Sequence, residues 1–122
     1  MTVQELYERI GGDYEAAKKI MMMDQIIGRM IVKYTDDSSC AALNSAVETM
    51  DPGKLFESAH TLKGVSANLG LKEISSRASI LADEFRPGRS RTMSDDQVRE
   101  KVNELTALDR KAKEGIREFA GA

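Results

Sequence analysis

The chain contains one histidine, His60, and the side chains that would surround it on a helix predict chemistry there. Residues three and four positions apart share a helix face. Around His60 that face holds Phe56, Lys63 and Gly64, with Ala67 two turns away. A neutral imidazole is a good nucleophile near neutral pH, and a nearby lysine can neutralise the charge on phosphoryl oxygens. These residue types at this spacing predict a site that accepts a phosphoryl group.

Gly64 is the least expected member of this face. A glycine inside a helix costs roughly 1 kcal/mol relative to alanine, so its presence indicates a need for space. We interpret Gly64 as clearance beside the imidazole, continued by the small side chain of Ala67. Two other interpretations stay open: Gly64 can instead mark a close contact between helices, and a lone histidine on a helix is more often structural than functional.

The helix that carries His60 has clear ends in the sequence. Asp51 and Pro52 form an N-cap followed by a proline in the first turn, and Gly70 is the type of residue that ends a helix in the left-handed region. Between them runs an inward-facing stripe of Leu55, Ala59, Leu62, Ser66 and Leu69. Because His60 lies about 100° around the helix from Ala59, its imidazole is predicted to lie beside the core, at the boundary with solvent.

The N-terminal third of the chain is also predicted to be helical. A short helix is expected over residues 3–10, ended by Gly11 and Gly12. Asp13 is then expected to cap one long helix that continues to about Tyr34. The predicted inward stripe of this long helix is Ala16, Ile20, Met23, Ile27, Met30 and Tyr34, at steps of 4, 3, 4, 3 and 4.

Further helices are expected over about residues 40–50, 74–85 and 95–119. Ser94 and Gln97 match a capping box at the start of the last one. The acids Asp83 and Glu84 are interpreted as part of a solvated face. Short loops between amphipathic helices predict one all-α domain over residues 1–122, an antiparallel four-helix bundle with a short N-terminal helix at one end.

Composition excludes several other classes of protein. The net charge of −2, with bases interspersed among acids, offers no footprint for nucleic acid. Cys40 is the only cysteine and is expected to be a buried small hydrophobe; with one histidine besides, the chain has too few ligands for a metal or haem site. The longest apolar run, residues 20–23, cannot span a membrane. With no signal core either, a cytoplasmic location is expected.

The segment from Ala59 to Gly70, with His60, Lys63 and Gly64 in register, resembles the signature of the histidine-containing phosphotransfer (HPt) domain family of two-component phosphorelays. Weaker similarity extends over residues 5–88, including the glycine-glycine-aspartate run at 11–13, and the last helix matches in type only. The resemblance implies that His60 is the phospho-acceptor, Lys63 the phosphate partner and Gly64 the clearance position.

The resemblance also implies the partners. A response-regulator receiver domain, or a hybrid sensor kinase, would supply the phosphoryl group, the magnesium site and most catalytic groups. The chain would then bind no cofactor itself and act as a phosphocarrier rather than an enzyme, and no nucleotide-binding loop is present. A monomer is expected. Two alternatives stay open: a scaffold that docks receivers without transfer, and a phospho-accepting domain of a larger sensor kinase, although Met1 and the self-contained length favour a separate protein.

Residues 21–27 carry more apolar surface than one inward stripe needs. Met22 and Ile26, four positions apart, can form part of an adaptable receiver-docking surface. Alternatively, the short N-terminal helix covers this surface through Leu6 and Ile10. The sequence supports both interpretations equally.

Overall fold

The computed structural model describes residues 1–121, and this part of the chain consists of helices and loops only. The elements are α1 (Val3–Ile10), α2 (Tyr14–Met21), α3 (Asp24–Lys33), the 3₁₀ helix η1 (Tyr34–Asp36), α4 (Ser39–Thr49), α5 (Pro52–Asn68), α6 (Lys72–Glu84) and α7 (Asp95–Gly121). The predicted all-α fold is confirmed.

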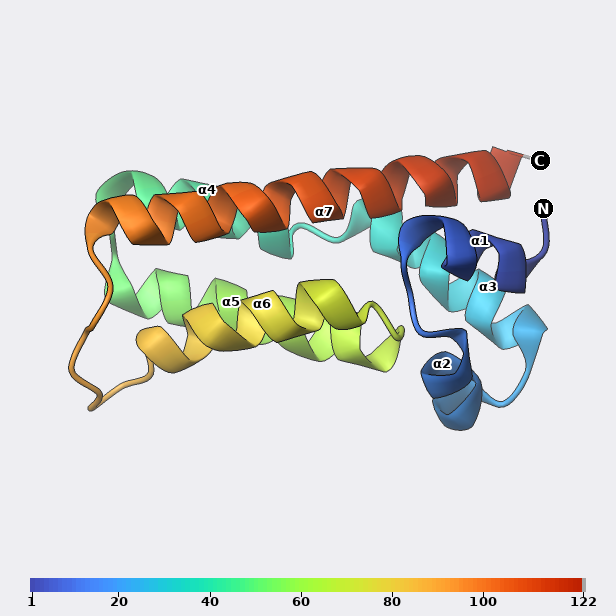
Figure 1. Ribbon diagram of the computed structural model, residues 1–122, viewed down its shortest axis with the longest axis horizontal. Helices are drawn as coiled ribbons and strands as arrows, with labels where there is room; N and C mark the ends of the chain where they lie inside the picture. Colours follow the sequence, from blue (N-terminus) through green and yellow to red (C-terminus); the bar gives the residue numbers. More distant parts are fainter. Residues whose placement is uncertain (122) are drawn as a thin grey trace.

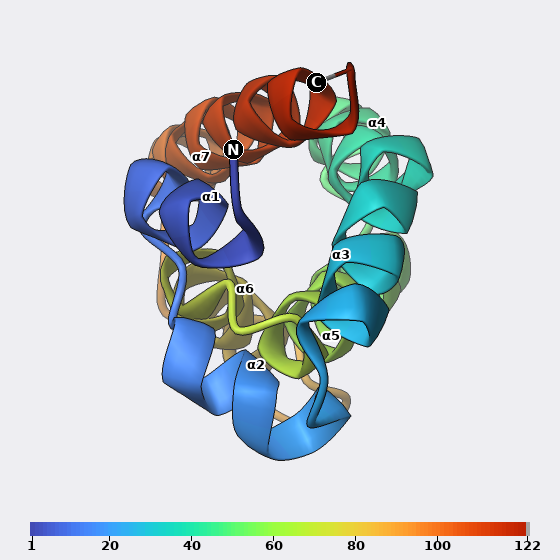
Figure 2. The same ribbon diagram turned by 90° about the vertical axis from the view of Figure 1, so that its right-hand side faces the viewer.

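The helices α4, α5, α6 and α7 form a closed four-helix bundle in which each helix packs on the next and α7 returns to α4. Successive helices of the bundle run in opposite directions (Figure 1). The long α7 continues past the bundle, where it contacts α1 and α3. Figure 2, viewed along the bundle, shows α1, α2 and α3 gathered at this end of the molecule. The predicted bundle is therefore present, with three short helices rather than one at its end.

Several predicted helix ends are also confirmed. The Asp13 carboxylate accepts the Ala16 N–H at 3.0 Å and caps α2. Ser94 and Gln97 exchange the two hydrogen bonds of a capping box before α7.

The core is built from all of the α-helices, and its largest fully buried side chains are Tyr7, Tyr34, Leu6, Ile27, Ile31, Leu43, Leu55, Leu62, Leu81, Leu105, Ile116 and Val98.

The prediction of one long helix from Asp13 to Tyr34 is wrong. The chain leaves the helix at Met22, whose φ of 70° is left-handed, and α3 begins only at Asp24. The change of direction also alters which side chains face the core. The buried residues of this region are Ala17, Ile27, Ile31 and Tyr34, whereas Ile20, Met23 and Met30 of the predicted stripe are exposed.

Contacts made by α2 explain the break. The Asp13 N–H donates to the Gly70 carbonyl at 2.7 Å, which fixes the start of α2 against the turn between α5 and α6. The Asp24 carboxylate, at the start of α3, accepts hydrogen bonds from two side chains of α2, the Tyr14 hydroxyl at 2.5 Å and the Lys18 ammonium at 2.8 Å. Because α3 packs on α1 and α7 as well as on α2, a single straight helix cannot make all of these contacts.

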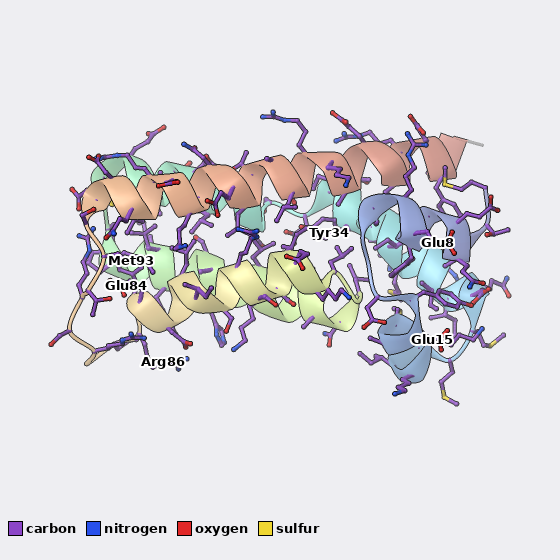
Figure 3. All side chains as sticks on the ribbon, in the orientation of Figure 1. Glu8, Glu15, Tyr34, Glu84, Arg86 and Met93 are labelled. Atoms are coloured by element: carbon purple, nitrogen blue, oxygen red, sulfur yellow. The ribbon has the colours of Figure 1, made fainter. Side chains whose placement is uncertain are left out.

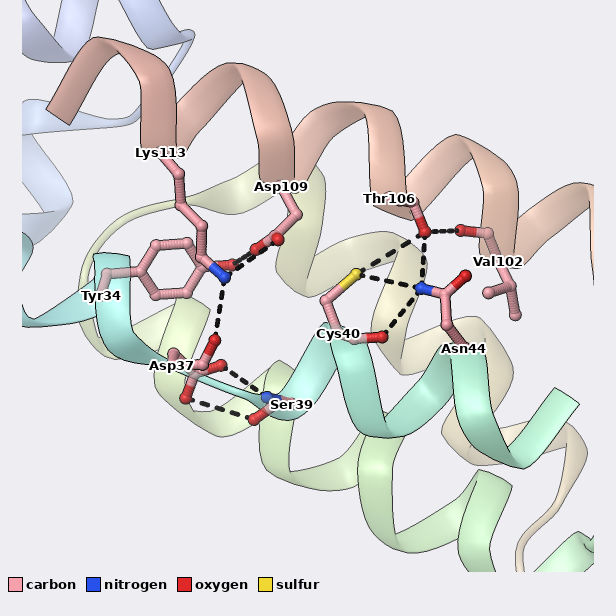
Figure 4. Close-up of polar contacts among 9 residues, drawn as sticks. All are labelled: Tyr34, Asp37, Ser39, Cys40, Asn44, Val102, Thr106, Asp109 and Lys113. Atoms are coloured by element: carbon pink, nitrogen blue, oxygen red, sulfur yellow. Dashed lines mark hydrogen bonds and ion pairs between the residues drawn. The ribbon is translucent and has the colours of Figure 1, made fainter. Parts of the chain in front are cut away.

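A buried polar cluster ties the chain between α3 and α4 to α7 (Figure 4). The Tyr34 hydroxyl donates to Asp109 at 2.6 Å, and Lys113 pairs with the same carboxylate at 3.1 Å. Lys113 also donates to the Asp37 carbonyl at 2.8 Å. Cys40 is buried nearby, as predicted. The cluster fixes the start of α4, the helix that flanks α5.

Candidate functional site

The helix α5 carries His60, and both of its ends form as the sequence predicts. The Asp51 carboxylate accepts the Lys54 N–H at 3.1 Å, and Pro52 occupies the first turn. At the other end, Leu71 N–H donates to the Ser66 carbonyl at 2.9 Å and Gly70 N–H to the Ala67 carbonyl at 3.1 Å. This pair of bonds is a Schellman motif around a left-handed glycine.

The C-terminal end of α5 is held by the N-terminal helices. The buried Tyr7 hydroxyl donates to the Leu69 carbonyl at 2.6 Å. Gly70 has a φ of +73°, and a Cβ there would lie 2.5 Å from the Asp13 carbonyl oxygen. Glycine is therefore required at this turn both for its backbone conformation and for the close approach of α2. The resulting anchor keeps α5 from sliding along its axis.

His60 lies where the helical pattern predicts. Its neighbours Ala59 and Leu62 are fully buried, while His60 itself is exposed. The imidazole stacks on the Phe56 ring at a centroid separation of 5.4 Å and an interplanar angle of 18°. The half-buried Phe56 packs against the core, so it restricts the imidazole from one side while solvent reaches the other.

Gly64 faces open space. An added Cβ would meet no heavy atom within 4 Å, and the residue is exposed. The alternative of a close helix–helix contact at Gly64 is therefore wrong. Its φ is not left-handed either, so the backbone does not require glycine. Ala67, one turn further, is exposed as well. The two positions leave a low strip on α5 beside His60.

Lys63 is half-buried on α5. At the end of α6, Arg86 donates to the Asp83 carboxylate at 2.7 Å. This hydrogen bond lowers the pKa of Asp83; burial opposes the shift, and the positive charges of Arg86, Lys63 and Arg89 add to it. The Arg86 guanidinium carbon also lies 5.9 Å from the centroid of the Phe56 ring. A cluster of cations around Asp83 thus adjoins the His60 face.

Sequence reasoning missed this contribution of α6, and it was wrong about Glu84. Glu84 is 2% exposed, and its carboxylate accepts the Thr92 and Met93 N–H groups, each at 2.6 Å, and the Thr92 hydroxyl at 2.7 Å. Burial raises the pKa of Glu84, but these hydrogen bonds outweigh it and hold the pKa below its ordinary value. Figure 3 shows Glu84 beside Met93, with Arg86 just beyond the end of α6. The sequence does contain one indication of this buried role of Glu84. The loop of residues 86–94 follows directly, and its backbone N–H groups need an acceptor.

Met22 and Ile26 lie at the opposite end of the molecule from the last turn of α6. Met22 is in the break between α2 and α3, and Ile26 is in the first turn of α3. Met22 is 74% exposed and Ile26 is half-buried. The interpretation that the first helix covers them through Leu6 and Ile10 fails for Met22, because the Met22 side chain remains exposed. One turn beyond Ile26, Met30 borders an open groove of about 350 Å³ between α3 and α5.

This groove connects the exposed side of α3 to the His60 helix. On α5 it is lined by Val65, Asn68 and Leu69, and on the α3 side by Met30 and Lys33 among others. Val65 is the direct chain neighbour of Gly64. Met30 on α3 and Val65 on α5 therefore line the same groove.

Comparison with known proteins identifies the family. The family model described as the Hpt domain matches residues 37–113, more than half of the chain. The match spans α4, α5, α6 and most of α7, and so includes the whole of the helix that carries His60. Neither the curated proteins nor the solved structures gave a match. This chain belongs to the HPt-domain family of two-component phosphorelays.

Membership of this family implies histidine-based phosphotransfer in a phosphorelay, with response-regulator receivers as the class of partner. HPt domains are phosphocarriers rather than catalysts. Within residues 1–121, no group of three or more histidine, cysteine, aspartate or glutamate side chains is arranged to hold a metal ion. No helix in the same range is both long and apolar enough to cross a bilayer.

Proposed function

We propose that this chain accepts a phosphoryl group on His60 from the phospho-aspartate of one receiver domain and passes it to the aspartate of another. In the first step, a ring nitrogen of neutral His60 attacks phosphorus with its lone pair. The P–O bond of the acyl phosphate breaks, and its electron pair leaves on the aspartate carboxylate. The second step is the reverse reaction on a different receiver. The observation that carries the proposal is an exposed imidazole beside the open space at Gly64.

The chain contributes position and charge to this reaction. Phe56 holds the imidazole by stacking, and Lys63, one helical turn away, reduces the charge on the transferred phosphoryl group. Transfer from an aspartyl phosphate would also draw on a magnesium ion to neutralise the charge on the phosphoryl oxygens and on the leaving carboxylate. We assign that magnesium ion to the receiver, because the residues of this chain around His60 are an aromatic ring, cations and a glycine rather than a set of oxygen ligands.

We further propose that receivers dock on the surface formed by Met22 and Ile26 and continued by the groove at Met30 and Val65. Exposed methionines suit such a surface, since their flexible thioether side chains adapt to different partners. A receiver seated there would cover the strip at Gly64 and bring its aspartate to His60.

We also propose that the chain works in the cytoplasm and as a monomer. Light scattering during size-exclusion chromatography measures the mass of the particle in solution and so tests the monomeric state.

Phosphotransfer profiling tests the central proposal. Each candidate receiver is loaded with a small acyl phosphate, mixed with the chain, and the phosphoryl group is followed on phosphate-affinity gels. We expect label on the wild type and none on His60→Gln. Incubation with ATP alone should leave the chain unmodified. Labelling of His60→Gln at the wild-type rate, or labelling by ATP without a partner, would refute the proposal.

The same variant separates transfer from scaffolding. If the chain only docks receivers, His60→Gln and the wild type bind receivers equally and neither carries label. If it is the phospho-accepting domain of a larger sensor kinase, the full-length product of the gene contains a kinase domain.

Two docking variants test the surface. Met22→Asn and Ile26→Ser should each slow transfer from the receiver by weakening docking. A matched control is phosphoramidate, a small donor that phosphorylates histidine without docking. Its reaction with His60 should be the same in the variants and the wild type. Equal receiver transfer in all three proteins would contradict the proposed surface.

A further inference from the structure

One cation lies beside His60 on α5, and a second lies against the Phe56 ring on which His60 stacks. Lys63 lies one turn along α5. Arg86 lies just after the end of α6 (Figure 3), and its guanidinium carbon is 5.9 Å from the centroid of the Phe56 ring. The same ring stacks on His60 at 5.4 Å, so Arg86 is no further from the imidazole than the sum of these two distances. A flexible arginine can cover much of that separation when a charged group appears on the ring.

In the unphosphorylated protein Asp83 holds one of these cations directly. Arg86 donates to its carboxylate at 2.7 Å, and the positive charge of Lys63 helps to lower the pKa of Asp83. The pair is about half exposed, with side-chain exposures of 51% for Arg86 and 47% for Asp83. Such an ion pair is weak and easily exchanged. Arg86 is therefore kept near the site without being locked to Asp83.

Phosphorylation brings a second anion to the same cations. A phosphoryl group carries up to two negative charges and three strong acceptor oxygens. It would attract Lys63 and Arg86 and be repelled by the carboxylate of Asp83. Lys63 and Arg86 would therefore stabilise the phosphorylated form of His60, and Asp83 would destabilise it.

We propose that Asp83 competes with the phosphoryl group on His60 for Lys63 and Arg86, and thereby limits the stability of the phosphorylated chain so that transfer stays reversible. This inference rests on the proposed function. Asp83 touches neither the phosphoryl group nor the reacting atoms, so it acts as a positioning residue through the two cations. For a relay point this is useful, since a phosphohistidine that is too stable would not pass its group on.

The test measures an equilibrium rather than a rate. A receiver loaded with a small acyl phosphate is freed of donor and mixed with the chain, and the ratio of phosphorylated chain to phosphorylated receiver is measured once it is constant. Tighter docking speeds the forward and the reverse phosphoryl transfer by the same factor, so it does not change this ratio. We expect Asp83→Asn to shift the ratio towards the phosphorylated chain by about twofold to fivefold, and Arg86→Ala to shift it the other way by a similar factor.

A second ion pair in the same region provides a matched control. Arg91 pairs with Asp95 at 2.6 Å and lies 5.4 Å from the Phe85 ring centroid, the same arrangement on a different aromatic ring. Asp95→Asn and Arg91→Ala should leave the ratio unchanged. Thermal melts of all four variants report any purely structural effect.

The signs of the shifts decide the outcome. If the Asp83–Arg86 pair is only structural, both of its variants lower the melting temperature and leave the ratio at the wild-type value, which overturns the proposal. Shifts in the same direction for Asp83→Asn and Arg86→Ala overturn it too. Failure of the proposed function looks different, because the wild type and every variant then carry no label.

Discussion

Replacing Gly64 should separate stability from function in this protein. The position is inside α5, has no left-handed φ, and offers open space to a new Cβ. Nothing in the fold therefore opposes alanine. Alanine is favoured over glycine in a helix interior by roughly 0.5–1 kcal/mol, so Gly64→Ala should stabilise the chain by about that amount. For a domain of this size, the melting temperature should rise by a few degrees.

The effect on transfer should have the opposite sign. The receiver must bring its aspartate to His60 across the strip that Gly64 leaves low. A methyl group there is a small obstacle, whereas the side chain in Gly64→Leu extends into the path of the receiver. A displacement of the reacting groups by about 1 Å can cost up to about 100-fold in rate. We expect a loss of a fewfold for Gly64→Ala and of about 10- to 100-fold for Gly64→Leu.

The assay combines thermal melts followed by circular dichroism with single-turnover transfer from a loaded receiver. Gly53→Ala is a matched control on the same helix, since an added Cβ there makes only an ordinary contact with Asp51, at 3.5 Å. It should affect stability in the same direction and leave transfer unchanged. Phosphoramidate, which needs no docking, should label His60 in every variant.

Two results would refute this reasoning. Transfer by Gly64→Leu at the wild-type rate would mean that no partner surface approaches Gly64. Parallel losses in melting temperature and in transfer across the Gly64 variants would mean that the glycine serves the fold, and the clearance argument would fail.

Three further predictions concern the framework of the site. Tyr34→Phe removes the buried 2.6 Å hydrogen bond to Asp109 and should cost about 1–3 kcal/mol in denaturant unfolding; no loss would show that the hydroxyl contributes nothing. Glu84 has a lowered pKa, so its contribution to stability is complete above its ordinary value of 4.5 and is lost as the pH falls through the lower folded value. Glu84→Gln should thus destabilise the chain at neutral pH and flatten the acid side of its melting-temperature profile, and an unchanged profile would contradict this. Gly70→Ala forces a left-handed alanine against the Asp13 carbonyl and should cost more than about 2 kcal/mol, measured by the same unfolding curves; a stabilised variant would disprove the close approach.

The site on α5 could be predicted because the helix ends and the side-chain positions depend on residues that are close together in the sequence. Asp51, Pro52 and Gly70 delimit the helix through backbone hydrogen bonds and φ preferences that involve only a few neighbouring residues. Within it, helical geometry alone places His60 at the edge of the core and gives it Lys63 as a neighbour. The structure agrees on each of these positions.

The break at Met22 could not be predicted in the same way. No glycine or proline marks it, and the apolar steps of 4 and 3 continue across it, so the local pattern favours one helix. The left-handed turn lies between α2, whose start is bonded to the distant Gly70 carbonyl, and α3, which packs on α1 and α7. A change of axis then rotates α3, which buries Ile31 and exposes Met30.

The sequence by itself thus determined the helical class, the ends of α5 and the face on which His60 lies, because each depends on hydrogen bonds and side-chain spacing within one helix. Only the tertiary structure decided what α6 adds to that face. Arg86 reaches Phe56, and Glu84 is buried under the following loop, because α6 packs antiparallel to α5. It also decided that the space at Gly64 is open, since that depends on where every other helix lies.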